Sequence, residues 1–249
     1  MGKHHTLSEE TLRDARQWDA RHVGVVTALW VAGAIALALL SVAAHTHDEF
    51  PGDLGLTLLL QHLNGTPLAP IITFASDANW PTPAGITAVA VILALAALRQ
   101  FRAASATAIA GFGADLANVT LNGLVARPRP HNAHIQVVAQ LGLHSFPSGH
   151  VTHVIALYGF LFYVSHRVAL AHPAWHPWLR AVQVICLYFM IAIGPARVLL
   201  GEHWPSDVLA SYILGALVLA IGIAVYHLLA LAWVAREEHA HGGAQLAGR

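Results

Sequence analysis

Charged residues are scarce in this chain of 249 amino acids, of which only 10% are Asp, Glu, Lys or Arg. An average soluble domain has about 25%. Thirteen basic and thirteen acidic side chains cannot cover a water-facing globule of this size, and their zero net charge provides no basic face for nucleic acid. Because 56% of the residues are hydrophobic, a disordered chain is excluded as well. The class that remains is a polytopic membrane protein.

Cysteine occurs once. Cys186 alone can form neither an internal disulfide nor a cysteine-based zinc site. The eighteen histidines invite a metal-transport interpretation, but their spacing matches no zinc or two-metal ligand pattern. The sequence therefore predicts no bound metal and no other cofactor.

Six apolar segments are candidates for crossing a bilayer, which takes about 20 helical residues. They cover residues 23–44, 84–98, 103–125, 148–165, 178–197 and 208–235. We therefore expect an all-α bundle of six transmembrane helices. It forms one domain, 23–235, between an N-terminal segment, 1–22, and a C-terminal tail, 236–249.

The longest connection between the expected spans is the loop 45–82. Its apolar stretch 54–63 is too short to span and is expected to lie at the membrane interface as a helix. Residues 76–83 contain two prolines and predict a turn into the second span. The first 22 residues are too polar and too charged for a cleavable signal peptide, so we expect the first span to be retained.

The basic residues orient the bundle. Ten of the thirteen lie in the two terminal segments and in the loops that follow the second and fourth spans. The positive-inside rule therefore places both termini in the cytoplasm. Alanine-rich spans suggest a bacterial inner membrane. The three other basic residues, Arg127, Arg129 and Arg197, then lie toward the periplasm or exterior, where orientation does not require them.

Three short motifs are expected together at the external ends of spans three to six. They are Arg127-Pro-Arg129-Pro, the run Pro-Ser148-Gly149-His150, and Arg197 followed at fixed spacing by His203 and Asp207. Each has an ordinary alternative when taken singly. The first suits a lipid-headgroup anchor, the second a helix cap, and the third a packed histidine beside an apolar helix.

Together the three motifs suit a phosphate ester. Arginine provides planar, multidentate donors for phosphate oxygens, and a helix that opens with Ser148-Gly149 directs backbone N–H groups at an anion. Phosphoryl transfer then needs a nucleophile and an acid, and two histidines can divide these roles. Asp207 lies four residues after His203, a spacing that lets its carboxylate orient the imidazole.

The order of these motifs resembles that of the type-2 phosphatidic acid phosphatases, the membrane branch of a superfamily shared with vanadium haloperoxidases. The run from Gly201 to Asp207, GEHWPSD, adds to the likeness. The resemblance implies that His203 is the nucleophile that forms a phosphohistidine. It implies that Asp207 orients His203, and that His150 protonates the leaving alkoxide and then activates water.

The same resemblance implies a phosphate-binding set. Arg129 and Arg197 match the arginines that clamp the phosphate, and Ser148 and Gly149 match the donors that hold its oxygens. Members of this family use no metal, which agrees with the absence of metal-ligand spacing in this chain.

Two positions depart from the family's pattern. Asn122 stands where the first motif begins with lysine, and Ala196 stands where the third begins with serine. Lys3 is the only lysine in the chain, so no other residue can replace the motif lysine as such. We include Asn122 among the phosphate-binding candidates as a hydrogen-bond donor. Arg127, two residues before Arg129, is a further candidate that would compensate for the missing charge.

Asp115 is an acidic residue well inside the third span. It shares one helix face with Asn118 and Asn122, at positions i, i+3 and i+7. A polar seam that leads to the site and a structural set of interhelical hydrogen bonds are both consistent with this pattern.

The sequence thus predicts a metal-independent membrane phosphatase that acts on a lipid phosphate or diphosphate. Phosphatidic acid, phosphatidylglycerol phosphate and an isoprenyl diphosphate all fit, and the expected partners are this substrate and the membrane lipids. Two alternatives stay open. One is a membrane transporter that uses the Asp115 seam, and the other is a weakly active family member that binds lipid phosphates.

Overall fold

The structure is a computed structural model that describes residues 20–139, 141–142 and 144–247, and every regular element in these ranges is helical. The prediction of an all-α protein is confirmed. The helices are α2 (Ala20–Thr46), α3 (Asp53–Gln61), α4 (Leu68–Asp77), α5 (Pro81–Ala97), α6 (Phe101–Val125), α7 (Gly149–Ala171), the short 3₁₀ helix η1 (Pro173–Trp175), α8 (His176–Leu199) and α9 (Pro205–Ala247). Most of the predicted N-terminal segment lies outside the described residues, as do Lys3, Arg13, Arg16 and Arg249.

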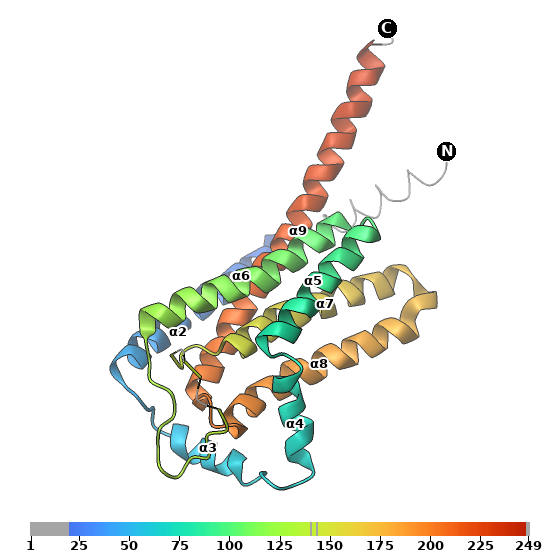
Figure 1. Ribbon diagram of the computed structural model, residues 1–249. Coiled ribbons are helices and arrows are strands. Elements are labelled where there is room, and N and C mark those ends of the chain that lie inside the picture. The colour runs from blue at the N-terminus through green and yellow to red at the C-terminus, as the bar shows by residue number, and fades with distance from the viewer. Residues whose placement is uncertain (1–19, 140, 143, 248–249) are drawn as a thin grey trace.

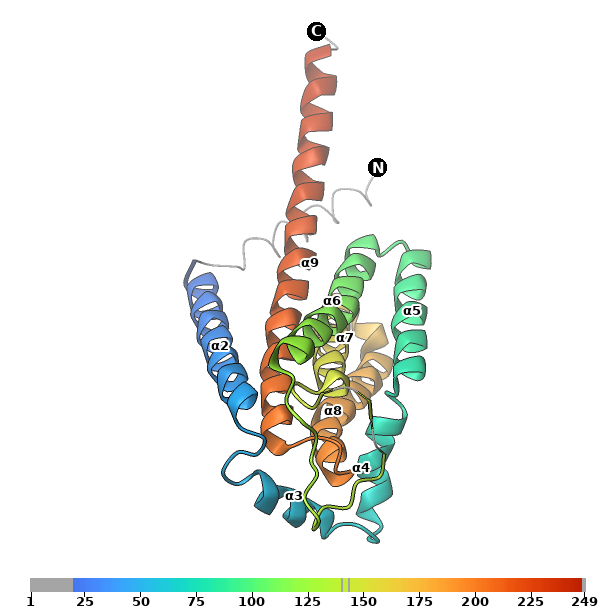
Figure 2. The ribbon, with the colours of Figure 1, turned by 60° about the vertical axis from the view of Figure 1, so that its left-hand side comes forward.

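The predicted spans coincide with helices of the bundle in Figure 1. Five of them, α2, α6, α7, α8 and α9, are long and apolar enough to cross a membrane. The predicted second span falls in α5, which passes this test only together with α4, at an angle of 65° to it. The protein therefore has five candidate spans, or six if this bent pair forms one span. The protein is therefore an integral membrane protein. Helix α9 is longer than predicted and extends well beyond the other helices (Figure 2).

The connection 45–82 is more ordered than the sequence suggested. The predicted interfacial helix is α3, but α4 was not predicted, and the expected turn at 76–83 shrinks to residues 78–80. Pro70 does not interrupt α4 because it lies in the first helical turn, where its missing N–H costs nothing. Pro81 and Pro83, which we expected in the turn, open α5 for the same reason.

Helix α7 forms the centre of the bundle and packs against α6, α8 and α9. Small residues permit this close packing. Ala106, Ala110 and Ala114 are fully buried along one face of α6. On α9, a Cβ at Gly215 would lie 2.7 Å from the Ile155 side chain and 3.0 Å from a carbonyl oxygen of α7. Glycine is therefore required at this crossing.

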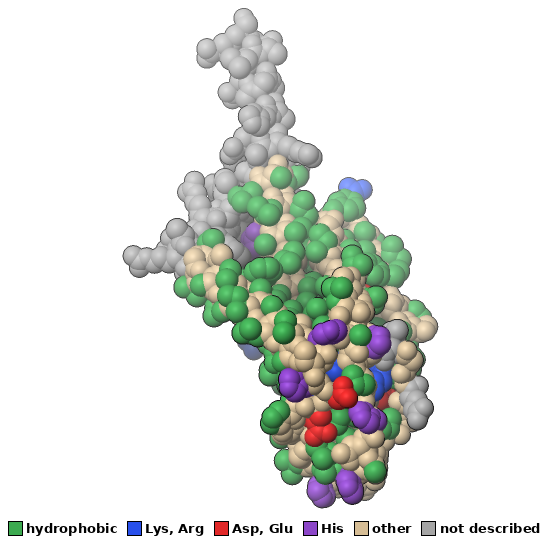
Figure 3. Space-filling model, turned by 90° about the vertical axis from the view of Figure 1, so that its left-hand side faces the viewer, with side chains coloured by type: hydrophobic (Ala, Val, Ile, Leu, Met, Phe, Trp, Pro, Cys, Tyr) green, Lys and Arg blue, Asp and Glu red, His purple; other side chains and the backbone are tan. Residues whose placement is uncertain are grey.

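Apolar side chains cover most of the bundle's outer surface, as Figure 3 shows for one face. Helix α2 is the most peripheral span and leans on α9, where the Trp30 indole donates to the carbonyl oxygen of Leu217 at 3.2 Å. Histidine and acidic side chains gather at one end of this face. This distribution is the one expected of a bundle whose middle faces hydrocarbon and whose ends face water.

Helix α3 packs against this polar end with its polar face inward. Asp53, Thr57 and Gln61, spaced four residues apart, are buried, whereas Leu56 and Leu59 are more than half exposed. Gln61 donates to the carbonyl oxygens of Gln136 and of Leu199, at 2.7 and 3.1 Å. The helix thus ties the loop after α6 to the end of α8, and Leu56 and Leu59 remain on its exposed face.

Candidate active site

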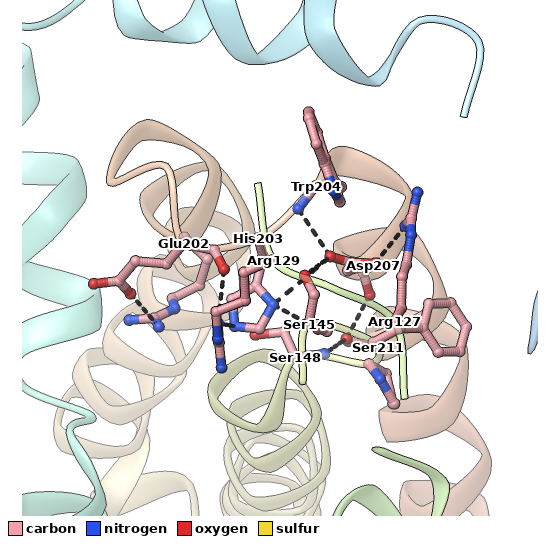
Figure 4. A network of polar contacts seen from close by, with 12 residues as sticks. Arg127, Arg129, Ser145, Ser148, Glu202, His203, Trp204, Asp207 and Ser211 are labelled. Carbon is pink, nitrogen blue, oxygen red and sulfur yellow. Dashed lines mark hydrogen bonds and ion pairs between the residues drawn. The ribbon is translucent and has the colours of Figure 1, made fainter. Parts of the chain in front are cut away.

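His203 lies in the turn between α8 and α9, where its ring is almost completely buried. Its Nδ1 is 2.7 Å from the carbonyl oxygen of Ser145, and its Nε2 is 3.3 Å from a guanidinium nitrogen of Arg129 (Figure 4). A carbonyl oxygen can only accept, so Nδ1 must carry the proton of the neutral ring. The lone pair of the neutral ring is then on Nε2.

Burial lowers the pKa of His203 to about 4. The positive charges of Arg197 and Arg129 lower it further, while Asp207 acts in the opposite direction. The imidazole is therefore neutral at physiological pH and its Nε2 is available as a nucleophile.

Asp207, in the first turn of α9, is fully buried and accepts hydrogen bonds on both oxygens. One oxygen is 2.5 Å from Arg127, and the other accepts from the Ser145 hydroxyl and the Trp204 backbone N–H (Figure 4). Its nearest oxygen is 3.9 Å from Nδ1 of His203. Asp207 therefore acts on His203 chiefly through Ser145 and the turn, since the carbonyl of Ser145 is the direct partner of the ring.

Arg127 is also fully buried, and its contacts are with carboxylates of the protein, although we predicted that it would help to bind phosphate. Its guanidinium bridges Asp207 and Asp53, the latter at 3.0 Å, and covers the Phe50 ring at 4.5 Å. Asp53 also accepts from the backbone N–H and the hydroxyl of Ser206, at the start of α9. Arg127 is thus held by two carboxylates and fixes the start of α9.

Ser148, Gly149 and His150 form the start of α7, as predicted. Ser148 occupies the N-cap position, but its hydroxyl makes no capping hydrogen bond, which argues against the alternative of a simple helix cap. Among the described residues, the Ser148 Oγ and the His150 Nε2 are buried without a hydrogen-bond partner. A Cβ at Gly149 would lie 3.0 Å from the Asn118 side-chain oxygen, so glycine fits closely here. Unsatisfied buried donors at a helix N-terminus suit an anion.

Two of the predicted arginines lie on either side of Glu202. Arg197, at the end of α8, pairs with the Glu202 carboxylate and donates to the Ser76 hydroxyl at 2.7 Å, while its Nε has no partner among the described residues. Arg129 donates to the Glu202 backbone carbonyl at 2.7 Å. Burial raises the pKa of Glu202, against the effect of the two arginines, and burial lowers the pKa of Arg129.

The polar face of α6 holds the segment that precedes α7. Asn122 donates to the carbonyl oxygens of His144 and Phe146, at 2.9 and 3.1 Å, and Asn118 donates to that of Pro147 at 3.0 Å. The amide donor of Asn122, predicted to bind phosphate, is therefore already used by the protein. The seam has a structural role at these two positions.

A cavity of about 650 Å³ lies beside these groups, between α5, α6 and the start of α7. We name it the lipid-side cavity. Of the predicted site residues it is lined by His203, His150, Arg129, Gly149 and Asn122, whereas Ser148, Arg197, Asp207 and Arg127 do not line it. The Trp80 ring, 40% exposed, lies at its wall with its centre 5.3 Å from that of His150.

A second cavity of about 510 Å³, the loop-side cavity, lies among the loop that follows α6 and the turn 201–202. Arg129 and Leu141 line both cavities, so the guanidinium lies at their common boundary. His131, Asn132 and Glu202 give the loop-side cavity a polar wall. Within the part of the chain that the structure describes, no three His, Cys, Asp or Glu side chains gather as metal ligands.

Several residues of this network were not among the predicted candidates. They are Asp53, Ser76, Ser145 and Glu202. Only Asp53 has a signal in the sequence, because it begins the series of polar residues spaced four apart on an otherwise apolar helix. The other three act through contacts between distant segments, for which local spacing has no signature.

The fold and the site together define a class: a membrane helical bundle with a histidine- and arginine-lined site at one end. Comparison with known proteins agrees. The family model of the PAP2 superfamily matches residues 99–230, more than half of the chain, and the protein belongs to this superfamily. The suspected family is thereby confirmed.

Two solved structures have the same fold. One is the first transmembrane PAP2-type phosphatidylglycerolphosphate phosphatase from Bacillus subtilis, with a TM-score of 0.65 and 20% identity over 78% of this chain and 94% of that one. The other is LpxE from Aquifex aeolicus, with a TM-score of 0.54 and 18% identity over 71% of this chain and 98% of that one.

Proposed function

We propose that this protein is a lipid phosphate phosphatase of a bacterial inner membrane whose site faces the periplasm and which acts through a phosphohistidine. The observation that carries the proposal is the His203 ring. The Ser145 carbonyl fixes its Nδ1–H, burial keeps it neutral, and it lines a cavity together with His150 and Arg129. Membership of the PAP2 superfamily and the phosphatase named in one structural relative support the same activity.

The first chemical step transfers the phosphoryl group to His203. Its Nε2 attacks phosphorus and the bond from phosphorus to the ester oxygen breaks. His150, which takes up a proton when the anionic phosphate binds beside it, gives that proton to the leaving alkoxide. Arg129, beside Nε2 at 3.3 Å, is placed to stabilise the charge on the phosphoryl oxygens. The N-terminus of α7, where Gly149 lines the cavity, supplies neutral donors. The unpartnered Ser148 hydroxyl lies behind the cavity wall, as does Arg197, which supplies positive charge from there.

The second step returns the enzyme to its starting state. His150 takes a proton from a water molecule, the resulting hydroxide attacks phosphorus, and the P–N bond to His203 breaks. The sum of both steps converts a lipid phosphate and water into a lipid alcohol and inorganic phosphate. Among the protein's groups only His150 gives and takes a proton in this scheme, because His203 keeps its Nδ1–H throughout.

The two cavities separate lipid from water. The lipid-side cavity lies between two spans, α5 and α6, so a lipid can place its phosphate at Arg129 while its chains remain in hydrocarbon. The loop-side cavity lies on the other side of Arg129 with a polar wall, which suits entry of water and release of phosphate. Because lipid and water enter through different cavities, the alcohol product can leave by the route through which the lipid came.

Phosphate release by the purified protein in detergent tests the proposal. We expect turnover of long-chain lipid phosphates that persists in EDTA and is blocked by vanadate. His203→Gln should abolish this turnover, and His166→Gln, an exposed histidine at the other end of α7, should retain it. Equal turnover by the His203 variant and the wild type would refute the assignment of the nucleophile.

A further inference from the structure

Asp115 and His153 form a pair that the mechanism above does not use. Asp115 is on α6, His153 is on α7, and a carboxylate oxygen of the first lies 2.9 Å from Nδ1 of the second. Both line the lipid-side cavity. The Asp115 side chain is 47% exposed, although it lies within an apolar span. Ionisable groups at such positions are costly, and they commonly mark a functional site.

The pair offers acceptors only. A carboxylate accepts the Nδ1–H of His153, so Nε2 of the neutral ring carries a lone pair. This Nε2 is buried and has no hydrogen-bond partner among the described residues, and His153 as a whole is 5% exposed. Much of the cavity wall nearby is apolar, including Ala84 and Val119. A ligand that satisfies this pair must bring an O–H or N–H donor into an otherwise apolar cavity.

The position of the pair along α6 and α7 indicates where the donor group must lie relative to the phosphate of the substrate. His153 follows His150 by three residues on α7, a rise of about 4.5 Å along the helix axis. Asp115 lies seven residues before Asn122 on α6, about 10 Å further from the polar end. The pair therefore lies on the side of His150 that receives the alcohol part of the substrate, and not on the side of the phosphate.

Resting on the proposed function, we infer that the Asp115–His153 pair selects lipid phosphates that carry a hydroxyl or an amide N–H on the carbon next to the one that bears the ester oxygen. The hydrogen bond forms with the alcohol portion of the lipid, in both substrate and product. The substrate class is thereby narrowed to hydroxyl- or amide-bearing lipid phosphates. Fully esterified and simple isoprenyl phosphates lack such a donor.

Two matched pairs of substrates test this inference. The first is 1-oleoylglycerol 3-phosphate and its 2-O-methyl ether, and the second is a long-chain N-acylethanolamine phosphate and its N-methyl amide. In the second member of each pair a methyl group replaces the donor hydrogen, and the variants below separate the loss of the donor from the added bulk. We expect wild-type kcat/KM to favour the donor-bearing member of at least one pair by about tenfold, the effect of one buried hydrogen bond. Equal values within both pairs, or turnover of phosphatidic acid but of none of the four, would overturn the inference. Absence of turnover of these four and of phosphatidic acid alike would overturn the proposed function.

Variants assign the preference to the pair. His153→Phe should bring the ratio close to one, and His153→Gln, which keeps an acceptor, should retain part of it. Asp115→Asn preserves the shape of the side chain but no longer fixes which imidazole nitrogen of His153 carries the proton. The ratio of kcat/KM values within a substrate pair should therefore fall in this variant too, which provides a second test if the Phe variant does not fold. His166→Phe, the same change at the other end of α7, is the matched control. A tenfold preference that survives in both His153→Phe and Asp115→Asn would contradict the assignment.

Discussion

Arg127 and Arg129 lie two residues apart, but replacing Arg127 should chiefly lower stability, whereas replacing Arg129 should chiefly lower activity. The Arg127 guanidinium is fully buried between Asp53 and Asp207, at 3.0 and 2.5 Å. Arg127→Gln leaves two buried carboxylates without their cation, a change that costs about 3–5 kcal/mol. At roughly 2–4 °C for each kcal/mol in a chain of this size, the unfolding temperature should fall by about 6–20 °C. Arg129→Gln should leave the unfolding temperature nearly unchanged and lower kcat/KM.

Thermal unfolding and phosphate release, measured on both variants in the same detergent, provide the comparison. The double variant Asp53→Asn/Arg127→Gln should recover part of the lost stability, because it removes one of the two unpaired charges. Arg127→Lys should recover little, since a single ammonium cannot bridge both carboxylates in the same geometry. An Arg127→Gln variant with wild-type stability and a raised KM would refute the reasoning and would return Arg127 to the phosphate-binding set.

Three further changes test other parts of the site. Asn122→Asp replaces the donor to two backbone carbonyls with an acceptor. The unfolding temperature without ligand should therefore fall, and kcat/KM should fall at least tenfold. Asn64→Asp, the same change at an exposed position, should alter neither quantity. The pKa of His203 is about 4 in the folded protein and about 6.5 in the unfolded chain, so between these pH values only the unfolded chain binds this proton. The free energy of unfolding of the wild type, relative to that of His203→Gln, should therefore fall by about 2 kcal/mol from pH 7 to pH 5. A constant difference between the two proteins would contradict the lowered pKa. Gly201→Ala places a Cβ 2.3 Å from the Gln136 carbonyl oxygen and should displace His203 and abolish turnover. Gly65 also has a positive φ but open space around it, so Gly65→Ala should cost stability alone.

The spans were predictable because hydrocarbon imposes a length and a composition on each helix. The meeting of the motifs was predictable as well. In an up-and-down bundle, the end of α6 and the start of α7 lie at one side, together with the end of α8 and the start of α9. Helix α4 escaped prediction because it has only ten residues and lies in a proline-rich connection.

The partners of the candidate residues were less predictable. The spacing of His203 and Asp207 suggested one helical turn, but α9 begins only at Pro205, so His203 lies in the preceding turn and meets the Ser145 carbonyl instead. Asn122 matches the place of a motif lysine, yet its donors hold the segment before α7. Such choices depend on segments distant in the chain, whose approach is set by packing.

The central claim is that Nε2 of His203 accepts the phosphoryl group. The most direct measurement is rapid quenching of the protein with a lipid phosphate that carries a radioactive phosphorus, followed by mass spectrometry of the labelled peptide. We predict a phosphoryl group on His203 that is labile in acid and that, once formed, is lost more slowly in His150→Gln, where water is activated less well. Label on another residue, or turnover by His203→Gln without any label, would contradict the mechanism.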